Sequence, residues 1–359
     1  MRPVMRAGNG RQGAYGWVVE KRQFKEWLAD RNSMEAGNMD KFRFVILGAG
    51  KITGKFCEAV SLVENCEICA VASKSMERAA LVAGKHGIPR YYDNYEEMLE
   101  AEKPDGAYIA VTPNDHCRLS LMCIRHKVPV LCEKAMLQDS REAQEVFRAG
   151  KENGVFVMEA MWSRFLPAVR KVREWVAQGR IGTPQIAQCM IGFAAPQGKE
   201  NRFFNPQLGG GAAKDITVYA YEITDYILQQ EAQKMEVSVT WGETGVDVTN
   251  HISIQYTHTL ADLLTTFAAN LDGKMVIYGK KGKIELPGPH VASESFLYDE
   301  KGELTEHFTD EETKNGFTYE IEEMLCCVRE GRLESQIVPW KDTIECAKLF
   351  DRIGATFSS

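Results

Sequence analysis

The stretch Phe42–Phe56, FRFVILGAGKITGKF, decides the fold of this chain. Its first part, Phe42–Leu47, is a nearly unbroken apolar run, which predicts a strand buried on both faces. Gly48 and Gly50 follow at once, and apolar residues then recur at helical spacing through Phe56. A strand, a glycine-rich turn and a helix form the opening unit of a dinucleotide-binding fold, in which a pyrophosphate lies at the helix N-terminus.

The glycine fingerprint departs from its usual pattern at the third position. Gly48 permits the tight turn and Gly50 lets the backbone approach a phosphate, but Thr53 stands where Gly or Ala is usual. Because glycines also mark ordinary turns, this match alone leaves the loop open to either interpretation. Lys51 and Ile52, which follow the loop, are predicted cofactor contacts together with the two glycines.

Size and charge limit the classes of protein to consider. A chain of 359 residues suits two domains with a substantial core. Its 43 Lys and Arg against 50 Asp and Glu give a formal net charge of -7, which argues against nucleic acid or a membrane surface as a partner. No stretch approaches the length of a transmembrane helix, and none forms a secretion signal, so we expect a cytoplasmic protein.

The ten cysteines are expected to be reduced core thiols, because most lie inside predicted strands and helices. Cys66 and Cys69 form a C-x-x-C pair, which is a spacing used by zinc and redox sites. The pair runs into the second expected strand and has no second ligand pair, so we predict no metal site.

The chain divides into three parts. Residues 1–39 are Gly-rich and basic at first, and we expect either a leader upstream of the true start near Met39 or a partner-binding arm. Residues 40–161 alternate strand and helix patterns, which predicts a parallel sheet with helices on both faces, an NADP-binding Rossmann domain. Residues 162–359 predict an α+β substrate-binding and dimerisation domain on an open, mainly antiparallel sheet. The fold class is therefore α/β with a second α+β domain.

The expected elements share the apolar spacing of strands or helices. In the first domain the expected strands are 42–47, 68–72, 106–111, 128–132 and 155–158, with a short one near 89–92. In the second domain they are 185–191, 235–241, 251–256, 260–270, 275–278 and 283–286. Expected helices cover 76–86, 95–100, 115–126, 140–153, 166–178, a start at 209–213, and 319–330 and 343–354.

The end of the second strand favours NADP over NAD. NAD-specific sites place an acidic residue there to hold the ribose 2′-hydroxyl. This chain has Ser73 and Lys74, then Arg78 a turn later, which suits a 2′-phosphate with no carboxylate to repel it. A solvated helix start is the alternative interpretation of the same three residues.

Ligands of doubly wound sheets bind at the carboxyl ends of the strands. The residues that follow three such ends here, and so are candidate cofactor contacts, are Thr112, Asn114 and His116, then Glu133 and Lys134, then Trp162 and Arg164. Further along, Asp215 and Tyr219 are four residues apart and therefore share one face of a helix.

These residues could catalyse hydride transfer at a carbinol carbon. The substrate oxygen then gains or loses a proton in step with the hydride. Free tyrosine has a pKa near 10, and an ammonium such as Lys134 would favour the phenolate of Tyr219. Asp215 could orient the lysine or a substrate hydroxyl. Singly, each candidate also has a structural interpretation, as a packing aromatic, a helix cap or a solvated charge.

The chain resembles the glucose-fructose oxidoreductase / inositol dehydrogenase (Gfo/Idh/MocA) family. The resemblance covers residues 41–359 and is carried by FVILGAGKITGKF, VTPNDH, the EK of VLCEKAM, MEAMWSRFLP, GGGAAKDITVY and GFTYEIEEML. MEAMWSRFLP and DITVY are most similar to the dimeric dihydrodiol dehydrogenase branch, which is NADP-dependent. The resemblance implies that Lys134 is the catalytic lysine, that Asp215 is the helix aspartate and that Tyr219 is the acid/base.

The resemblance also implies that Trp162 and Arg164 contact NADP and that the open sheet forms a homodimer or higher homo-oligomer. Ala135, Thr53 and Lys214 depart from the family pattern and leave the substrate open. We expect an NADP-dependent oxidoreductase of a sugar, polyol or cyclic diol. The alternatives are a sugar-aldehyde or ketose reductase of the same family and a non-catalytic NADP-binding sensor.

Overall fold

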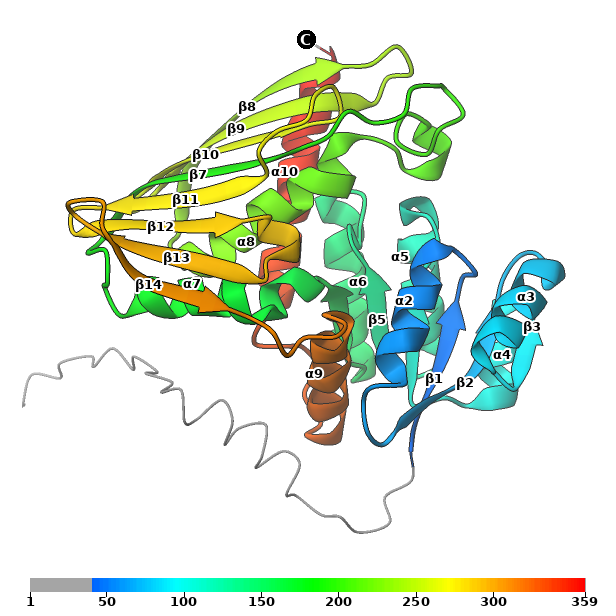
Figure 1. Ribbon diagram of the computed structural model, residues 1–359. Helices are drawn as coiled ribbons and strands as arrows, with labels where there is room; N and C mark the ends of the chain where they lie inside the picture. Colours follow the sequence, from blue (N-terminus) through cyan, green and yellow to red (C-terminus); the bar gives the residue numbers. More distant parts are fainter. Residues whose placement is uncertain (1–40, 359) are drawn as a thin grey trace, which may run out of the picture. The chain divides into compact units, whose positions relative to one another are not determined.

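The first described strands form the parallel sheet that the opening stretch predicts (Figure 1). The computed structural model describes residues 41–358, so the expected leader or arm lies outside the described residues. The sheet has the order β3-β2-β1-β4-β5-β6, whose strand order reverses beside β1, and ligands of such sheets bind at that point. Its strands are β1 Phe42–Leu47, β2 Cys66–Ala72, β3 Arg90–Tyr92, β4 Gly106–Ile109, β5 Val130–Glu133 and β6 Val157–Ala160.

The helices between these strands begin and end where local chemistry allows. They are α2 Lys51–Val60, α3 Met76–His86, α4 Tyr95–Glu102, α5 His116–Arg125 and α6 Ser140–Asn153. Asp139 caps α6 by accepting a hydrogen bond from the main-chain N–H of Glu142, and Gly154 ends the helix in a left-handed conformation. Short 3₁₀ turns follow β4 and β6, η1 Pro113–Asp115 and η2 Trp162–Phe165.

The second sheet has eight strands in the order β14-β13-β12-β11-β7-β10-β9-β8. Only β7 and β10 pair in parallel, so the expectation of a mainly antiparallel sheet is confirmed. Its strands are β7 Pro184–Gly192, β8 Ala232–Trp241, β9 Asp247–Tyr256, β10 Leu260–Thr266, β11 Lys274–Gly279, β12 Gly282–Pro287, β13 Glu294–Asp299 and β14 Leu304–Thr309.

Two of these strands, β13 and β14, were not expected from the sequence. β14 reads LTEHFT and lies mostly exposed at the edge of the sheet, so it lacks the apolar alternation of a half-buried strand. The expected strand 260–270 was too long, because β10 ends at Thr266.

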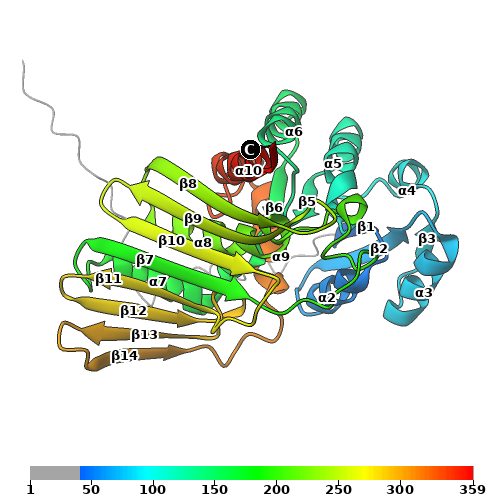
Figure 2. The same cartoon turned by 90° about the horizontal axis from the view of Figure 1, so that it is seen from above.

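Helices cover one face of the second sheet (Figure 2). They are α7 Pro167–Ala177, α8 Val218–Leu228 and α10 Trp340–Ala355, and a π-helical turn, η4 Ala213–Thr217, leads into α8. No helix of residues 41–358 covers the other face, where Ile186, Leu260 and Tyr278 are exposed apolar side chains.

The last two helices return to the first sheet. α9 Phe317–Arg329 packs on α2, and α10 packs on α6. The Trp340 indole donates a hydrogen bond to the Val157 carbonyl at 2.8 Å and stacks on Phe147. The predicted boundary between the two domains at residue 161 therefore stays a prediction, since both C-terminal helices contribute to the core of the first sheet.

Three further findings bear on the expectations from composition. All ten cysteines lie among residues 41–358 and none of them forms a disulfide there; eight are buried. No group of three or more His, Cys, Asp or Glu side chains suited to a metal ion occurs among residues 41–358. Within the same residues, no helix has the length and apolar character needed to cross a membrane.

Candidate active site

The glycine-rich loop between β1 and α2 is shaped by two glycines that serve different purposes. Gly48 has a φ of 122°, and a Cβ there would lie 2.3 Å from the carbonyl oxygen of Ala110, so the fold itself requires glycine. Gly50 has a φ of -89°, and a Cβ there would come no closer than 3.7 Å to Ala110. Space for a side chain therefore exists at Gly50, and the missing side chain exposes the main chain to a ligand.

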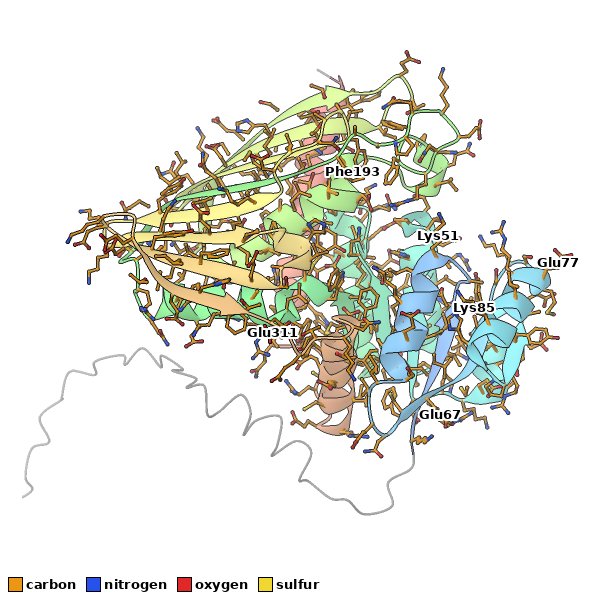
Figure 3. The ribbon with its side chains drawn as sticks, in the orientation of Figure 1. Lys51, Glu67, Glu77, Lys85, Phe193 and Glu311 are labelled. Carbon is orange, nitrogen blue, oxygen red and sulfur yellow. The ribbon has the colours of Figure 1, made fainter. Side chains whose placement is uncertain are left out.

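The N-terminus of α2 is suited to a pyrophosphate. No side chain caps this helix, and its first turn contains no acidic residue. Its first N–H groups and positive dipole end are thus available to an anion. Lys51 is exposed at this end of α2, whereas Glu67 marks the opposite edge of the sheet (Figure 3). These features fit the dinucleotide that the fold implies.

Thr53, which departs from the glycine fingerprint, fits into the buried interior between β1 and α2. Its side chain is fully buried, and its hydroxyl donates a hydrogen bond to the carbonyl oxygen of Gly48 at 3.1 Å. The hydroxyl therefore satisfies a buried acceptor of the loop and helps to hold its shape.

At the end of β2, Lys74 and Arg78 are exposed, while Ser73 is buried and its hydroxyl accepts a hydrogen bond from the Ser75 N–H at 3.3 Å. The ammonium of Lys74 lies 2.7 Å from a carboxylate oxygen of Asp115, in η1 after β4. The expectation that no carboxylate lies beside this site was therefore wrong.

Asp115 is itself held by two cations. Its other carboxylate oxygen lies 3.1 Å from the guanidinium of Arg118. Burial alone would raise the pKa of Asp115, but the bonds from Lys74 and Arg118 hold it below its usual range. Lys74 and Arg118 thus place two cations beside one carboxylate. Lys74 lies 41 positions from Asp115, so the sequence pattern did not show this ion pair.

Thr112 and Asn114, both exposed, lie on the loop after β4. The Asn114 side-chain amide donates to the carbonyl of Gln207 at 2.7 Å and accepts from the side-chain amide of Gln138 at 3.1 Å. Lys214 in turn contacts the Gln138 side-chain oxygen. Asn114 therefore ties the first domain to the loop that carries η3 Pro206–Leu208.

Three predicted cofactor side chains, those of His116, Glu133 and Arg164, are buried against protein groups, and their contact with the cofactor stays a prediction. Both ring nitrogens of His116 face main-chain carbonyls, of Val111 and Ala135, and burial lowers the pKa of this ring, so it is neutral and donates to one of them. The carboxylate of Glu133 accepts a hydrogen bond from the Tyr108 hydroxyl. Cofactor contact at these two positions would fall to main-chain atoms.

Arg164 is the most completely enclosed of the three. Its side chain is fully buried, and its guanidinium lies 2.5 Å from Glu222 and 2.6 Å from Asp342. It also donates to the main-chain carbonyls of Glu222 and Ile337. These contacts join η2 to α8 and α10 through one buried guanidinium.

The catalytic candidates come together between the two domains. The Lys134 ammonium donates to the main-chain carbonyl of Asp215 at 2.8 Å and to its carboxylate at 3.0 Å. It lies 4.7 Å from the ring centre of Tyr219. The Trp162 indole donates to the Tyr219 hydroxyl at 3.0 Å. Four of the predicted residues therefore share one site, although their roles stay predictions.

The charges of this site differ from the expectation in one respect. Burial raises the pKa of Tyr219 to about 12, and Lys134 only reduces that rise. Burial also opposes the ammonium of Lys134, but Tyr219 and Asp215 outweigh it and raise its pKa above the usual value. Tyr219 is therefore a neutral phenol beside a permanent ammonium, a pair that can donate a proton and stabilise the phenolate left behind.

The helix that carries Asp215 and Tyr219 rests on polar groups that sequence reasoning missed. A carboxylate oxygen of Asp247, in β9, accepts hydrogen bonds from the Ala213 N–H and the Asn250 side chain, both at 2.6 Å. Asn250 also donates to Thr217 at 3.1 Å. These buried contacts fix the start of the π-helical turn, and π-helical turns occur frequently at functional sites. No local motif marks Asp247, because its partners lie on another element.

Two further side chains reach the site from loops. Arg202 is exposed and lies 3.4 Å from the Asp215 carboxylate. The His290 ring, in η5 Pro289–Val291, lies 5.4 Å from the Tyr219 ring, centre to centre. Burial opposes the Asp215 carboxylate, but Lys134 and Arg202 keep its pKa below the usual value. His290 was not among the predicted site residues, because a lone histidine on a loop carries no motif.

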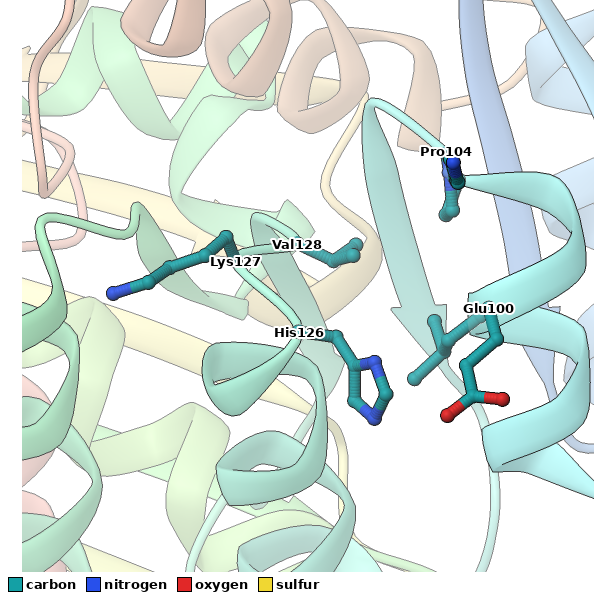
Figure 4. A pocket seen from close by; sticks show the side chains of 7 residues that line it. Glu100, Pro104, His126, Lys127 and Val128 are labelled. Carbon is teal, nitrogen blue, oxygen red and sulfur yellow. The ribbon is translucent and has the colours of Figure 1, made fainter.

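A pocket of about 490 Å³ lies elsewhere, lined in part by Glu100, Pro104 and His126 (Figure 4). Pro104 and His126 precede β4 and β5, so this pocket is at the amino ends of the strands. Cofactors of such sheets bind at the opposite edge, and the catalytic candidates lie there too.

Two family models match this chain. Residues 42–161 match the oxidoreductase family model with an NAD-binding Rossmann fold, and residues 169–285 match the GFO/IDH/MocA C-terminal domain. The chain belongs to the GFO/IDH/MocA oxidoreductase family. The resemblance inferred from the motifs is thereby confirmed, and the chain is an NAD(P)-dependent oxidoreductase rather than a non-catalytic sensor.

The similarity of this GFO/IDH/MocA member to its relatives covers nearly the whole described part of the chain. The trans-1,2-dihydrobenzene-1,2-diol dehydrogenase of Mus musculus is 31% identical over 327 residues, which cover 88% of this chain and 98% of the relative. The enzyme of the same name from Danio rerio is 30% identical, with the same coverage. An aldose-aldose oxidoreductase from Caulobacter crescentus has the same fold, with a TM-score of 0.80 at 19% identity over 89% of this chain and 98% of that one.

Proposed function

We propose that this enzyme transfers a hydride between NADP(H) and a secondary alcohol or carbonyl of a cyclic diol, with sugars and polyols as the neighbouring substrate class. The convergence of Lys134, Asp215 and Tyr219 carries the proposal, because it places a phenol that can give a proton beside an ammonium that stabilises the phenolate. The names of the relatives support a vicinal diol on a ring as the substrate.

The roles follow from the chemistry of each group. When bound, the nicotinamide supplies the carbon that gives or accepts the hydride. The Tyr219 hydroxyl holds the proton that the substrate oxygen takes up during reduction. Lys134 stabilises the developing phenolate, and the carboxylate of Asp215 orients the ammonium. The indole of Trp162 fixes the Tyr219 hydroxyl from one side.

We propose NADP rather than NAD as the preferred cofactor. Lys74 and Arg118 lie around one carboxylate at the end of β2, where the 2′-substituent of the ribose is expected. A 2′-phosphate can displace Asp115 from either cation, because exposed ion pairs contribute little to stability. Arg78, exposed one turn into α3, is a third cation for the same group.

Titration of the purified chain with NADPH and NADH tests the cofactor preference. We expect NADPH to bind at least about tenfold more tightly, a gap of roughly 1.4 kcal/mol. Lys74→Ala should weaken NADPH binding about tenfold and leave NADH binding unchanged. Lys51→Ala is the matched control, since a pyrophosphate contact affects both cofactors alike. Equal losses for both cofactors in Lys74→Ala would refute the preference.

A substrate screen tests the activity itself. The oxidation of cyclic 1,2-diols, polyols and sugars with NADP⁺ is followed by the absorbance of NADPH, and the reverse reaction with the matching ketones and aldoses. We expect turnover of at least one cyclic diol or its ketone, and its loss in Tyr219→Phe. Tight NADPH binding without turnover of any of these compounds would overturn the proposed function.

We also propose that two copies associate through the open face of the second sheet. Ile186, Leu260 and Tyr278 leave apolar surface there on three neighbouring strands. Tyr278→Glu combined with Leu260→Glu should convert a dimer to a monomer, as measured by the mass in solution. A monomeric wild-type protein would refute this proposal.

A further inference from the structure

His290 lies beside the catalytic candidates, and the proposed mechanism gives this residue no role. It lies in η5, the short turn between β12 and β13, and this turn packs against α8 and η2. Its ring is 5.4 Å from that of Tyr219, with an angle of 40° between the planes. The ring therefore faces the residue that handles the substrate oxygen.

The Nδ1 atom of His290 is buried and has no hydrogen-bond partner among residues 41–358. Buried polar side-chain atoms are normally paired, because an unpaired one loses its hydration without compensation. The turn is also held in place, with main-chain bonds of 2.7 Å from Val291 to Gly288 and from Gly288 to Gly273. Nδ1 is thus presented at a fixed position that no protein group uses.

The charge of the ring restricts what it can bind. The titratable groups that face it are Lys134, Asp215 and Tyr219. Burial and the Lys134 ammonium lower the pKa of His290, and Asp215 only partly opposes them. A neutral imidazole offers one donor and one acceptor, which matches a hydroxyl group better than an anion.

We propose that His290 determines substrate specificity by hydrogen bonding, through Nδ1, to the second hydroxyl of a vicinal diol whose first oxygen lies at the Tyr219 hydroxyl. The inference rests on the proposed function and names a residue that would recognise the second hydroxyl of the diol. Trp162 already binds the Tyr219 hydroxyl on one side, which leaves the side toward the substrate for the first oxygen. His290, next to the Tyr219 ring, then lies where the neighbouring oxygen projects.

The experiment compares two substrates that differ by one hydroxyl, trans-cyclohexane-1,2-diol and cyclohexanol. His290→Phe keeps a ring and removes both nitrogens, whereas His290→Gln keeps a polar group. We expect His290→Phe to lower kcat/KM for the diol at least about tenfold and for cyclohexanol by less than about threefold. His290→Gln should retain part of the preference. His258→Phe, on the exposed turn between β9 and β10, should change neither value.

Equal losses on both substrates, or an unchanged ratio of the two, would overturn the inference and leave the proposed function intact. Binding provides a readout that does not need turnover. NADPH-loaded wild type and variants are titrated with both compounds while the nicotinamide fluorescence is followed. Without turnover, a His290-dependent preference for the diol would support the inference although the proposed function fails. No preference for the diol by the wild type, in binding or in turnover, would overturn the inference.

Discussion

The ammonium of Lys134 donates to both the main-chain carbonyl and the carboxylate of Asp215, at 2.8 and 3.0 Å. Lys134 directly follows β5 of the Rossmann sheet, and Asp215 lies in the π-helical turn before α8. Because an ammonium has three donors, one remains for the Tyr219 side of the site. The pair therefore joins the two domains and aims one positive charge at the acid/base candidate.

Replacement of this ammonium should affect chemistry more than cofactor binding. We expect Lys134→Met to lower kcat/KM by about a hundredfold, because the phenolate of Tyr219 then forms without a neighbouring cation. The affinity for NADPH, measured by fluorescence titration, should stay within about threefold of wild type. Lys348→Met, on the exposed side of α10, is the control. Near-normal turnover in Lys134→Met would contradict the assigned role.

The pH dependence should differ between the two directions of the reaction. Burial raises the pKa of Tyr219 to about 12, so the residue is protonated from pH 6 to 9. Reduction needs the protonated form and should vary little in that range. Oxidation needs the phenolate, whose fraction rises about tenfold per pH unit below the pKa, so its kcat/KM should increase with pH.

Profiles of kcat/KM in both directions check this difference. Lys134, whose pKa is raised, stays charged over the same range and adds no step. His290, whose pKa is lowered, would add a step only at the acidic end. Oxidation that is independent of pH between 6 and 9 would show that Tyr219 is not the group that carries the proton.

The two loop glycines should respond to the same substitution in different ways. Gly48→Ala places a Cβ 2.3 Å from the Ala110 carbonyl at a φ of 122°, so we expect a lower Tm and no cofactor binding. Gly50→Ala finds 3.7 Å of space, so we expect an unchanged Tm and at least about tenfold weaker NADPH binding. Calorimetry and fluorescence titration distinguish these outcomes. Equal loss of Tm in both variants would contradict a ligand-facing role for Gly50.

Local patterns in the sequence were sufficient for the Rossmann unit. Gly48 is required by the tight turn, and the apolar run of β1 by burial on both faces. Both requirements appear as a local pattern in the sequence. Lys134 could be placed at the site because the carboxyl ends of parallel strands meet at one edge of the sheet. Its approach to Asp215, 81 positions away, was expected from the family resemblance together with the helical spacing of Asp215 and Tyr219.

The sequence does not show the environment of a residue where long-range packing decides it. Arg164 follows β6 and was predicted to contact NADP, and its partners Glu222 and Asp342 lie 58 and 178 positions away in the sequence. The strand β14 was not predicted, because an exposed edge strand needs no alternation of apolar residues. His290 escaped because only the folded turn shows that its ring faces Tyr219.

The buried ion pairs of Arg164 predict a stability effect rather than a binding effect. Arg164→Met breaks two buried pairs at once, to Glu222 and to Asp342, so we expect the free energy of unfolding to fall by about 3–5 kcal/mol. The folded fraction should keep its affinity for NADPH, since the guanidinium is fully buried among protein groups. Denaturant unfolding and cofactor titration below the Tm measure the two effects separately. Arg141→Met, on the exposed side of α6, is the control.

Changes at Glu222 complete this test. Burial raises the pKa of its carboxyl to about 8, even with Arg164 beside it. Because the folded pKa lies above the unfolded value, the contribution of Glu222 to stability is fully present below about pH 4.5 and is lost as the pH rises through 8. Glu222→Gln should therefore flatten the stability profile between pH 5 and 8, and Glu222→Leu should recover part of the loss in Arg164→Met. Intact stability but weakened NADPH binding in Arg164→Met would instead restore the arginine to the cofactor site.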